Sequence, residues 1–129
     1  MNSIPEHLPS DPEILDELRR RELTFHQPEA GTERNELALA TDEGFWEVGA
    51  SGRIYDREYV LGELERRAGV PREQWQATDF ACREIAAGIY LLTYKLAQQD
   101  RVTRRATIWR RTRTDWKILY HQGTVVTDF

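Results

Sequence analysis

The sequence predicts an α+β fold in which helices pack against one face of an antiparallel sheet. Residues 75–126 divide into four segments rich in β-branched and aromatic side chains, separated by short turn-like stretches, as in a meander of strands. Residues 11–68 instead hold three segments with apolar side chains at helical spacing and with start and stop signals. Helices segregated from antiparallel strands are typical of the α+β class.

Length and composition are those of one ordinary globular domain. The chain has 129 residues, of which 40% are hydrophobic and 31% are charged. Residues 1–10 contain Pro5 and Pro9 and few apolar side chains. We therefore expect a flexible leader over residues 1–10 and a single domain over residues 11–129.

Charge and cysteine content narrow the class of protein. The net charge of −4 gives no general attraction to nucleic acid or to anionic membranes, and we expect neither as a partner. The chain has one cysteine, Cys82, and no apolar run near the roughly twenty residues that span a bilayer. These features predict a cytoplasmic protein.

The first two helices are marked by their ends. Asp11 and Pro12 form an N-cap followed by proline at the first helical position, and the helix ends before Pro28. Its apolar positions include Leu18 and Phe25, and the charged run 17–22 is assigned mostly to the exposed side. The second helix opens at Gly31-Thr32, with Thr32 and Glu36 as an approximate capping pair, and ends near Thr41; its apolar stripe is Leu37, Leu39 and Ala40.

A short hairpin and a third helix come next. We expect a strand over residues 45–50, a hairpin turn at Ser51-Gly52 and an extended segment over residues 53–55. Asp56 can cap a helix over residues 57–68 that ends at Gly69. The side chains expected to face inward from this helix are Tyr59, Val60, Leu61 and Leu64.

The four segments of the meander have two apolar faces in a trial register with turns at residues 86–88, 98–101 and 112–115. A small monomer usually leaves one face of an antiparallel sheet in water, so we expect helices on one face and a partner chain on the other. One face carries Tyr90, Leu92, Tyr94, Arg105, Thr107, Trp109, Ile118, Tyr120 and Gln122; the other carries Ile89, Leu91, Thr93, Ala106, Ile108, Leu119 and His121.

Four pieces of the sequence resemble a bacterial subgroup, largely without assigned function, of the nuclear transport factor two-like (NTF2-like) superfamily. They include the strand-turn motif Glu47-x-Gly49-x-Ser51-Gly52-Arg53 and the terminal His121-Gln122-Gly123-Thr124. The superfamily also includes ketosteroid isomerase, scytalone dehydratase and SnoaL-type polyketide cyclases, so it mixes enzymes with binding modules. The pieces are GFWEVGASGRIYD (44–56), IYLLTYKL (89–96), RRATIWRR (104–111) and WKILYHQGTVV (116–126).

This resemblance implies a cone-shaped fold, with three N-terminal helices on a curved, mostly antiparallel sheet. It also implies a homodimer through the opposite sheet face, which the trial register makes the aromatic face of Tyr90, Trp109 and Tyr120. The general base of ketosteroid isomerase aligns with Val48, one residue after Glu47, and its oxyanion-hole acid has no clear match. Glu47 is therefore either a displaced base or an outward-facing residue.

Glu47 and His121 are the candidate catalytic residues. If the first strand neighbours the last and both side chains share a face, they can pair as an acid/base couple that needs no metal. The alternative is that they form a buried polar strut, or that Glu47 holds the Ser51-Gly52-Arg53 turn. No metal-ligand spacing or cofactor motif is present in the sequence, so we expect neither.

Other side chains are candidates for ligand contacts. Arg53 either anchors an anionic ligand at the mouth of the cone or pairs with Asp56 or Glu47. The arginines around residues 101–113 form either a local phosphate or carboxylate site or a set of solvated strand edges. The predicted ligand-binding residues are Trp46, Val48, Arg53, Thr93, Ile108 and Leu119.

The leading prediction is a protein that binds a small organic molecule in a largely apolar pocket between helices and sheet. One alternative is a cofactor-free isomerase, dehydratase or cyclase that uses Glu47 and His121. A second alternative is a dimeric protein-interaction module without a ligand.

Overall fold

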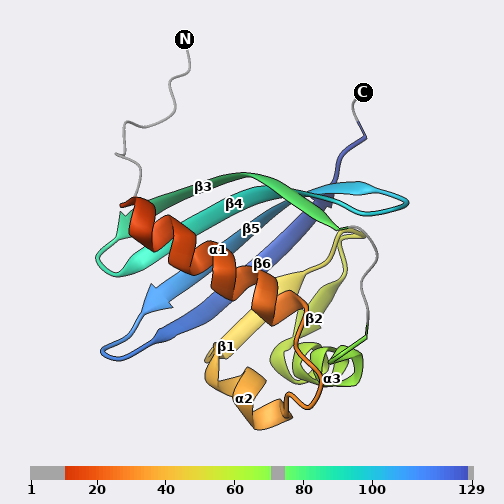
Figure 1. The fold of residues 1–129 in the computed structure, drawn as a ribbon, viewed down its shortest axis with the longest axis horizontal. Helices are drawn as coiled ribbons and strands as arrows, with labels where there is room; N and C mark the ends of the chain where they lie inside the picture. The colour runs from red at the N-terminus through yellow and green to blue at the C-terminus, as the bar shows by residue number, and fades with distance from the viewer. Residues whose placement is uncertain (1–10, 71–74, 128–129) are drawn as a thin grey trace.

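The computed structural model describes residues 11–70 and 75–127; the predicted leader lies outside this part. Two helices, a short hairpin, a third helix and a four-stranded meander follow one another, as predicted (Figure 1). The elements are α1 (Pro12–His26), α2 (Arg34–Leu39), β1 (Thr41–Val48), β2 (Ile54–Asp56), α3 (Arg57–Arg67), β3 (Gln76–Ala86), β4 (Ile89–Ala97), β5 (Val102–Arg111) and β6 (Trp116–Val125).

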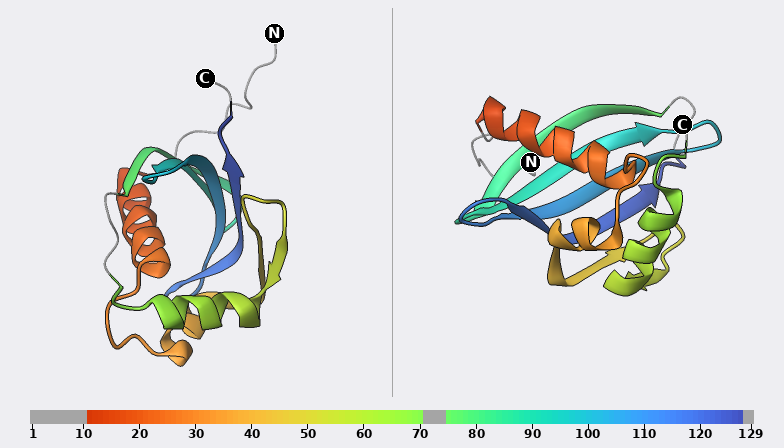
Figure 2. Two further views of the ribbon diagram at one scale, coloured as in Figure 1. Left: turned by 90° about the vertical axis from the view of Figure 1, so that its right-hand side faces the viewer. Right: turned by 60° about the horizontal axis from the view of Figure 1, so that its bottom comes forward.

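All six strands belong to one mixed sheet, in the order β2-β1-β6-β5-β4-β3. Strands β1 and β6 run parallel, and every other neighbouring pair is antiparallel. The sheet curves around α1, while α2 and α3 lie at the end formed by β1 and β2 (Figure 2). This arrangement encloses an interior between the helices and one face of the sheet. None of the helices in the described ranges is long and apolar enough to cross a bilayer.

Helix α1 begins as predicted but buries a residue that the sequence pattern assigned to its exposed side. The Asp11 side chain accepts a hydrogen bond from the backbone N–H of Glu13 at 2.8 Å, and Pro12 occupies the first turn. The buried residues are Leu18, Glu22 and Phe25, which share one helical face at spacings of four and three. The assignment of Glu22 to solvent is therefore wrong.

Three details of the shorter elements differ from prediction. Helix α2 begins at Arg34 with Glu33 as its N-cap, not at Thr32, because the Glu33 N–H donates to the Glu36 side chain at 3.1 Å. Leu39 is 70% exposed although it was predicted to face inward. Tyr59 was also predicted inward, but it is 51% exposed and its ring stacks on that of Tyr55.

Strand β1 covers Thr41–Val48 rather than the predicted residues 45–50, whereas the turn and the third helix follow their sequence signals. Gly52 has a φ of +90°, as a glycine turn requires. Asp56 caps α3 by accepting a hydrogen bond from the Tyr59 N–H at 2.9 Å. Val60, Leu61 and Leu64 are buried as predicted.

A bulge in β6 reverses part of the predicted register. Trp109 pairs with Ile118, whereas the preceding Ile108 pairs with Tyr120, so Leu119 is an extra residue. Beyond it, every side chain of β6 lies on the opposite face from that predicted. His121 consequently points into the interior beside Thr107, and Tyr120 points outward beside Ile108.

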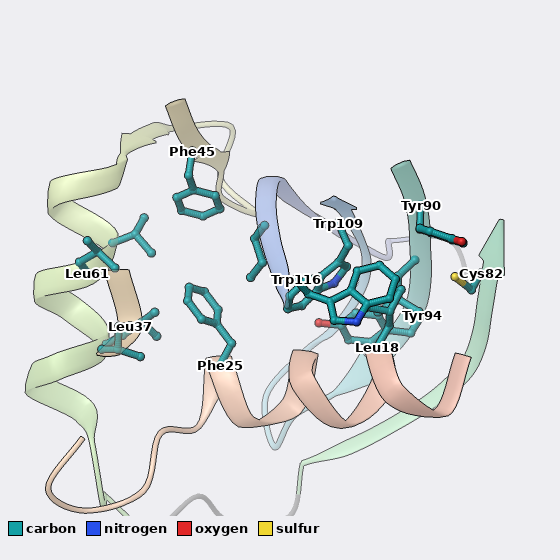
Figure 3. Close-up of a cluster of buried hydrophobic side chains, with 14 of the residues drawn as sticks. Leu18, Phe25, Leu37, Phe45, Leu61, Cys82, Tyr90, Tyr94, Trp109 and Trp116 are labelled. Atoms are coloured by element: carbon teal, nitrogen blue, oxygen red, sulfur yellow. The ribbon is translucent and has the colours of Figure 1, made fainter. Parts of the chain in front are cut away.

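The interior face carries most of the core (Figure 3). Trp109 and Tyr90 are 1% and 5% exposed and lie in the core with Leu18 of α1. The predicted aromatic face of Tyr90, Trp109 and Tyr120 is therefore not a surface, because two of these residues are internal and Tyr120 lies on the other side. The outer face instead presents Trp46, which is 43% exposed and lies 4.5 Å from Tyr120 between ring centroids.

Candidate functional site

A buried carboxylate is the centre of the polar interior. The Glu22 side chain is fully buried, yet it is supplied with donors from the sheet. Its Oε2 accepts hydrogen bonds from the hydroxyls of Tyr94 at 2.7 Å and Thr107 at 2.8 Å, and its Oε1 accepts one from Nε1 of Trp109 at 3.1 Å. We call Glu22, His26, Tyr94, Thr107, Trp109 and His121 the Glu22 cluster.

Two histidines complete the Glu22 cluster. Nε2 of His26, one helical turn along α1, lies 2.8 Å from Oε2 of Glu22. Nδ1 of His121 lies 3.5 Å from the same oxygen and 2.7 Å from the hydroxyl of Thr107. Burial raises the pKa of Glu22, but His26, His121 and the Tyr94 hydroxyl outweigh it and bring that pKa down to about 2. Glu22 is therefore an ionised acceptor at neutral pH.

The hydrogen-bond inventory assigns the tautomer of His121. An ionised Glu22 can only accept, so the single proton of the Thr107 hydroxyl is directed at Glu22. The Thr107 oxygen must then accept from His121, which places the ring proton on Nδ1. Burial, helped by His26 and Arg105, lowers the pKa of His121 to about 3 although Glu22 opposes this. His121 is thus neutral, and its Nε2 carries a lone pair.

The lone pair of His121 faces an arginine and a cavity. The Nη1 atom of Arg105 lies 3.5 Å from Nε2 of His121, and Nε of Arg105 donates to the Thr103 hydroxyl at 3.0 Å. Both residues line a cavity of about 240 Å³, which we call the His121 cavity. Its walls are Val48, Gly49, Ala50, Ser51, Tyr55, Arg101, Arg105, His121 and Gly123.

Glu47 lies beside His121 but has different neighbours from those expected. The two residues are direct partners on the parallel strands β1 and β6, so both side chains are on the interior face. The carboxylate nearest to Nδ1 of His121 is that of Glu22, at 3.5 Å, and Glu47 interacts electrostatically with His26, Arg105 and Arg67. Burial raises the pKa of Glu47 and Glu22 adds to this increase, whereas His26, Arg105 and Arg67 oppose it.

The predicted ligand-binding residues separate into different places. Val48 lines the His121 cavity, and Arg53 lies over the ring of another wall residue, Tyr55, at 5.6 Å. Trp46, Thr93 and Ile108 are on the outer face of the sheet. Trp46 and Ile108 both pair with the outward-facing Tyr120, and Thr93 pairs with Ala106. Leu119 is the bulge residue. The placement of Thr93, Ile108 and Leu119 around His121 is therefore wrong, because the bulge turned His121 away from them.

A second cavity, of about 380 Å³, lies between α1, α2 and the sheet. Phe25, Leu37, Ala40 and Trp109 give this α1–α2 cavity apolar walls, and Arg20, Arg21, Glu29 and Glu36 are charged residues that also line it. It matches the predicted location between helices and sheet, but its walls do not include the predicted site residues within the described ranges. The chemistry-bearing groups are at the His121 cavity instead.

Three side chains of the Glu22 cluster are of types that ligate metal ions. Glu22, His26 and His121 each offer one ligand atom, and these atoms lie within 4.8 Å of one another. Two imidazoles and a carboxylate suit a transition metal. However, Nδ1 of His121 is engaged by Thr107, and Oε2 of Glu22 accepts from two hydroxyls. Hydrogen bonding alone accounts for the positions of these three side chains.

Sequence reasoning missed Glu22 and Thr107 as site residues, and it named Arg105 only as one of the arginines that form either a phosphate or carboxylate site or a set of solvated strand edges. The signal for Glu22 was its spacing from Leu18 and Phe25, which places it on the buried face of α1. Thr107 and Arg105 alternate along β5 with outward-facing residues, between the buried Thr103 and Trp109. The sequence shows that both side chains lie on the same face of β5 as Trp109. It does not show that His121 lies on that face too, because this depends on the bulge in β6.

Structural comparison identifies the fold. The structure is similar to an NTF2-like protein from Cytophaga hutchinsonii, with a TM-score of 0.68, 13% identity, and coverage of 91% of this chain and 100% of that one. It is also similar to a putative Ca/calmodulin-dependent kinase II association domain from Exiguobacterium sibiricum, with a TM-score of 0.67, 14% identity, and coverage of 94% and 98%. A DUF3225 family protein of unknown function from Pectobacterium atrosepticum gives a TM-score of 0.67 at 12% identity, with coverage of 98% and 100%.

Sequence comparison adds no family assignment. No protein-family model matches the chain, and no curated protein sequence matches it. At identities of 12–14% the structural likeness establishes the fold and not a function. The chain thus has the NTF2-like fold that its sequence motifs indicated.

Proposed function

We propose that this NTF2-like protein binds a small organic molecule in the His121 cavity. The observation that carries the proposal is the convergence of two polar groups on one concave site: the lone pair of His121 Nε2 and the guanidinium of Arg105. Ligand sites are typically concave and present a few well-placed polar groups on a largely preformed surface. The Glu22 cluster supplies that preformation because it fixes the orientation of His121 from behind.

The walls of the His121 cavity define the size and polarity of the ligand. A volume of about 240 Å³ is below the roughly 300–1,000 Å³ of sites for drug-sized ligands, so the ligand is small. Tyr55 offers apolar contact, while Arg101, Arg105 and His121 offer polar contact. The pocket proposed here is thus more polar than the one expected from the sequence.

A cofactor-free proton-transfer enzyme is the second candidate, and the position of Glu47 favours it. A carboxylate whose pKa is raised by burial is a stronger base, and Glu47 lies beside His121 and near Arg105. In this version the ligand extends from the His121 cavity to Glu47, which does not itself line the cavity; Glu47 removes a proton from the ligand, and Arg105 stabilises the resulting negative charge. His121, whose pKa is lowered to about 3, accepts a hydrogen bond rather than a proton.

The binding proposal is tested by closing the cavity. Gly123 lines it, and a Cβ atom added there would come no closer than 3.9 Å to Arg105, so Gly123→Val fits the backbone and places its methyl groups in the cavity. Gly44→Val is the matched control, since Gly44 is an exposed β1 residue where an added Cβ lies 3.5 Å from Asp42.

The measurement is native mass spectrometry of the purified proteins, followed by denaturation and analysis of the released small molecules. We expect the wild type and Gly44→Val to retain the same compound and Gly123→Val to lose it. Retention of that compound by Gly123→Val would place binding elsewhere. Once a compound is identified, Glu47→Gln separates the two candidates, since an enzyme would keep binding and lose turnover.

The homodimer remains a prediction and now involves the outer sheet face. The exposed Trp46 and its neighbour Tyr120 supply aromatic area there, next to the half-buried Ile108. Large exposed apolar side chains of this kind favour association. Light scattering should give about twice the 15.1 kDa chain mass. A monomeric mass at all protein concentrations would contradict the homodimer prediction and would leave the binding proposal unaffected.

A further inference from the structure

We propose that the ligand of the His121 cavity is a small organic carboxylate that also carries a hydroxyl group. This inference rests on the proposed function and names its ligand class. The carboxylate is placed against the guanidinium groups of Arg105 and Arg101, and the hydroxyl donates to Nε2 of His121.

The charge of the His121 cavity favours an anionic ligand. Arg101 and Arg105 both line it, and its walls include no carboxylate among the described residues. The hydrogen-bond partners of these arginines are neutral: Nε of Arg101 donates to the Gln98 side chain at 3.3 Å, and Nε of Arg105 donates to Thr103 at 3.0 Å. The cavity therefore attracts an anion.

Other arginines in the described chain have a different environment. Arg21 pairs with Glu17 at 2.5 Å, Arg66 pairs with Glu63 at 2.6 Å, and Arg110 pairs with Asp42 at 2.6 Å. Glu47 does interact electrostatically with Arg105, but it lies on the neighbouring strand and does not line the cavity. The carboxylate that would complete the hydrogen bonding of Arg105 is thus expected from a ligand.

The geometry of Arg105 suits a carboxylate. Because its Nε is held by Thr103, the two Nη atoms form the free end of the guanidinium, and Nη1 already reaches within 3.5 Å of His121. Guanidinium groups bind carboxylates through paired N–H donors. Gly123, which is the strand partner of Arg105, has no side chain to cover this end.

The lone pair of His121 requires a donor group in the ligand. A neutral imidazole with its proton on Nδ1 cannot donate from Nε2, so that atom would repel a carboxylate oxygen and accept from an O–H. The carboxylate and the hydroxyl must therefore bind side by side, one at Arg105 and one at His121. A hydroxyl close to the carboxylate in the ligand, as in a 2-hydroxy acid, meets this requirement.

A matched set of three probes tests the assignment. Mandelate has the carboxylate, the hydroxyl and a ring that can contact Tyr55; phenylacetate lacks the hydroxyl, and mandelamide lacks the charge. Binding is followed by titration of the ¹⁵N-labelled protein, using amide shifts at Ser51, Arg105 and Gly123. We expect mandelate to bind at least about tenfold more tightly than mandelamide, with phenylacetate between them.

Two variants and one control locate the charge. Arg105→Ala should weaken mandelate binding about tenfold or more and leave mandelamide unchanged. Arg104→Ala is the control, since Arg104 is an exposed neighbour on the opposite face and lies 3.8 Å from Asp79. Arg101→Gln gives a second measurement of the effect of charge on mandelate binding. Because Arg101 is at an exposed turn, this measurement does not depend on the interior packing of Arg105.

The outcomes separate this inference from the proposed function. Equal binding of mandelate and mandelamide at the His121 cavity would overturn the carboxylate assignment and leave the binding proposal standing. Absence of shifts with all three probes would also overturn it, and the retained-ligand experiment would then decide the binding proposal by itself. An Arg105→Ala protein that binds mandelate as tightly as wild type would equally contradict the inference.

Discussion

Replacing the buried Glu22 by glutamine should destabilise the protein by about 4 kcal/mol. Gln has one acceptor oxygen and one NH₂ group, so it must turn a donor toward the Trp109 Nε1–H or toward the hydroxyls at Oε2. In the less costly orientation the NH₂ group takes the place of Oε1, which in the wild type accepts from Nε1 of Trp109 at 3.1 Å, so two donors face each other. A buried donor left without an acceptor costs about 1–3 kcal/mol.

The remaining cost comes from the lost charge. The hydrogen bonds from Tyr94, Thr107 and His26 become neutral pairs, and each loses about half of the roughly 1.5–3 kcal/mol of a charge-assisted bond. Offsetting this, glutamine is cheaper to bury than a carboxylate, so the total stays near the roughly 3–5 kcal/mol measured for broken buried pairs. This is a large part of the roughly 5–15 kcal/mol that stabilises a domain.

Urea denaturation at neutral pH, followed by tryptophan fluorescence, measures this change. Glu17→Gln provides the control on the same helix, because Glu17 is 33% exposed and pairs with surface arginines, where the loss should be below about 1 kcal/mol. If Glu22→Gln were as stable as Glu17→Gln, the interpretation of Glu22 as an ionised, fully donor-saturated acceptor would be wrong.

Further predictions follow from the same cluster. Stability should fall as the pH is lowered from 6.5 toward about 3, because His121 stays neutral in the folded state and gains a proton when unfolded, so the unfolded chain binds more protons. Glu22 adds to this loss between pH 4.5 and about 2, since it stays ionised only in the folded state, and a flat stability profile from pH 6.5 to 3 would contradict both assignments. Long-range ¹H–¹⁵N spectra at neutral pH should show the His121 proton on Nδ1, and Thr107→Val should abolish this preference. If the proton in the wild-type protein were on Nε2, His121 would donate to the ligand instead of accepting from it, and the proposed role of the ring would be wrong.

Much of the fold was predictable from local signals. The strand bounds of the meander agree with prediction to within a residue, because the turns at Gly88 and around residues 98–101 and 112–115 interrupt clear β-type segments. The Asp11 and Asp56 caps were recognisable because their side chains act on the next few residues of the chain. The resemblance motifs indicated the NTF2-like fold that structural comparison supports.

The site was less predictable, since it depends on one inserted residue and one buried charge. The bulge at Leu119 moves His121 from one face to the other, and side-chain parity cannot reveal such an insertion. Glu22 was grouped with the charged run 17–22, which was placed mostly on the exposed side of the helix, and isolated burial of a carboxylate is indeed costly. That cost is offset here by donors from β4 and β5, which no local pattern on α1 can show.

The central claim, that ligands enter the cavity at Arg105 and His121, is tested most directly by screening small-molecule cocktails against the ¹⁵N-labelled protein. The account predicts that the first amides to shift are those of Ser51, Arg105 and Gly123 around the His121 cavity. Shifts confined to Phe25 and Leu37, in the α1–α2 cavity, would contradict it and would place binding between the helices and the sheet.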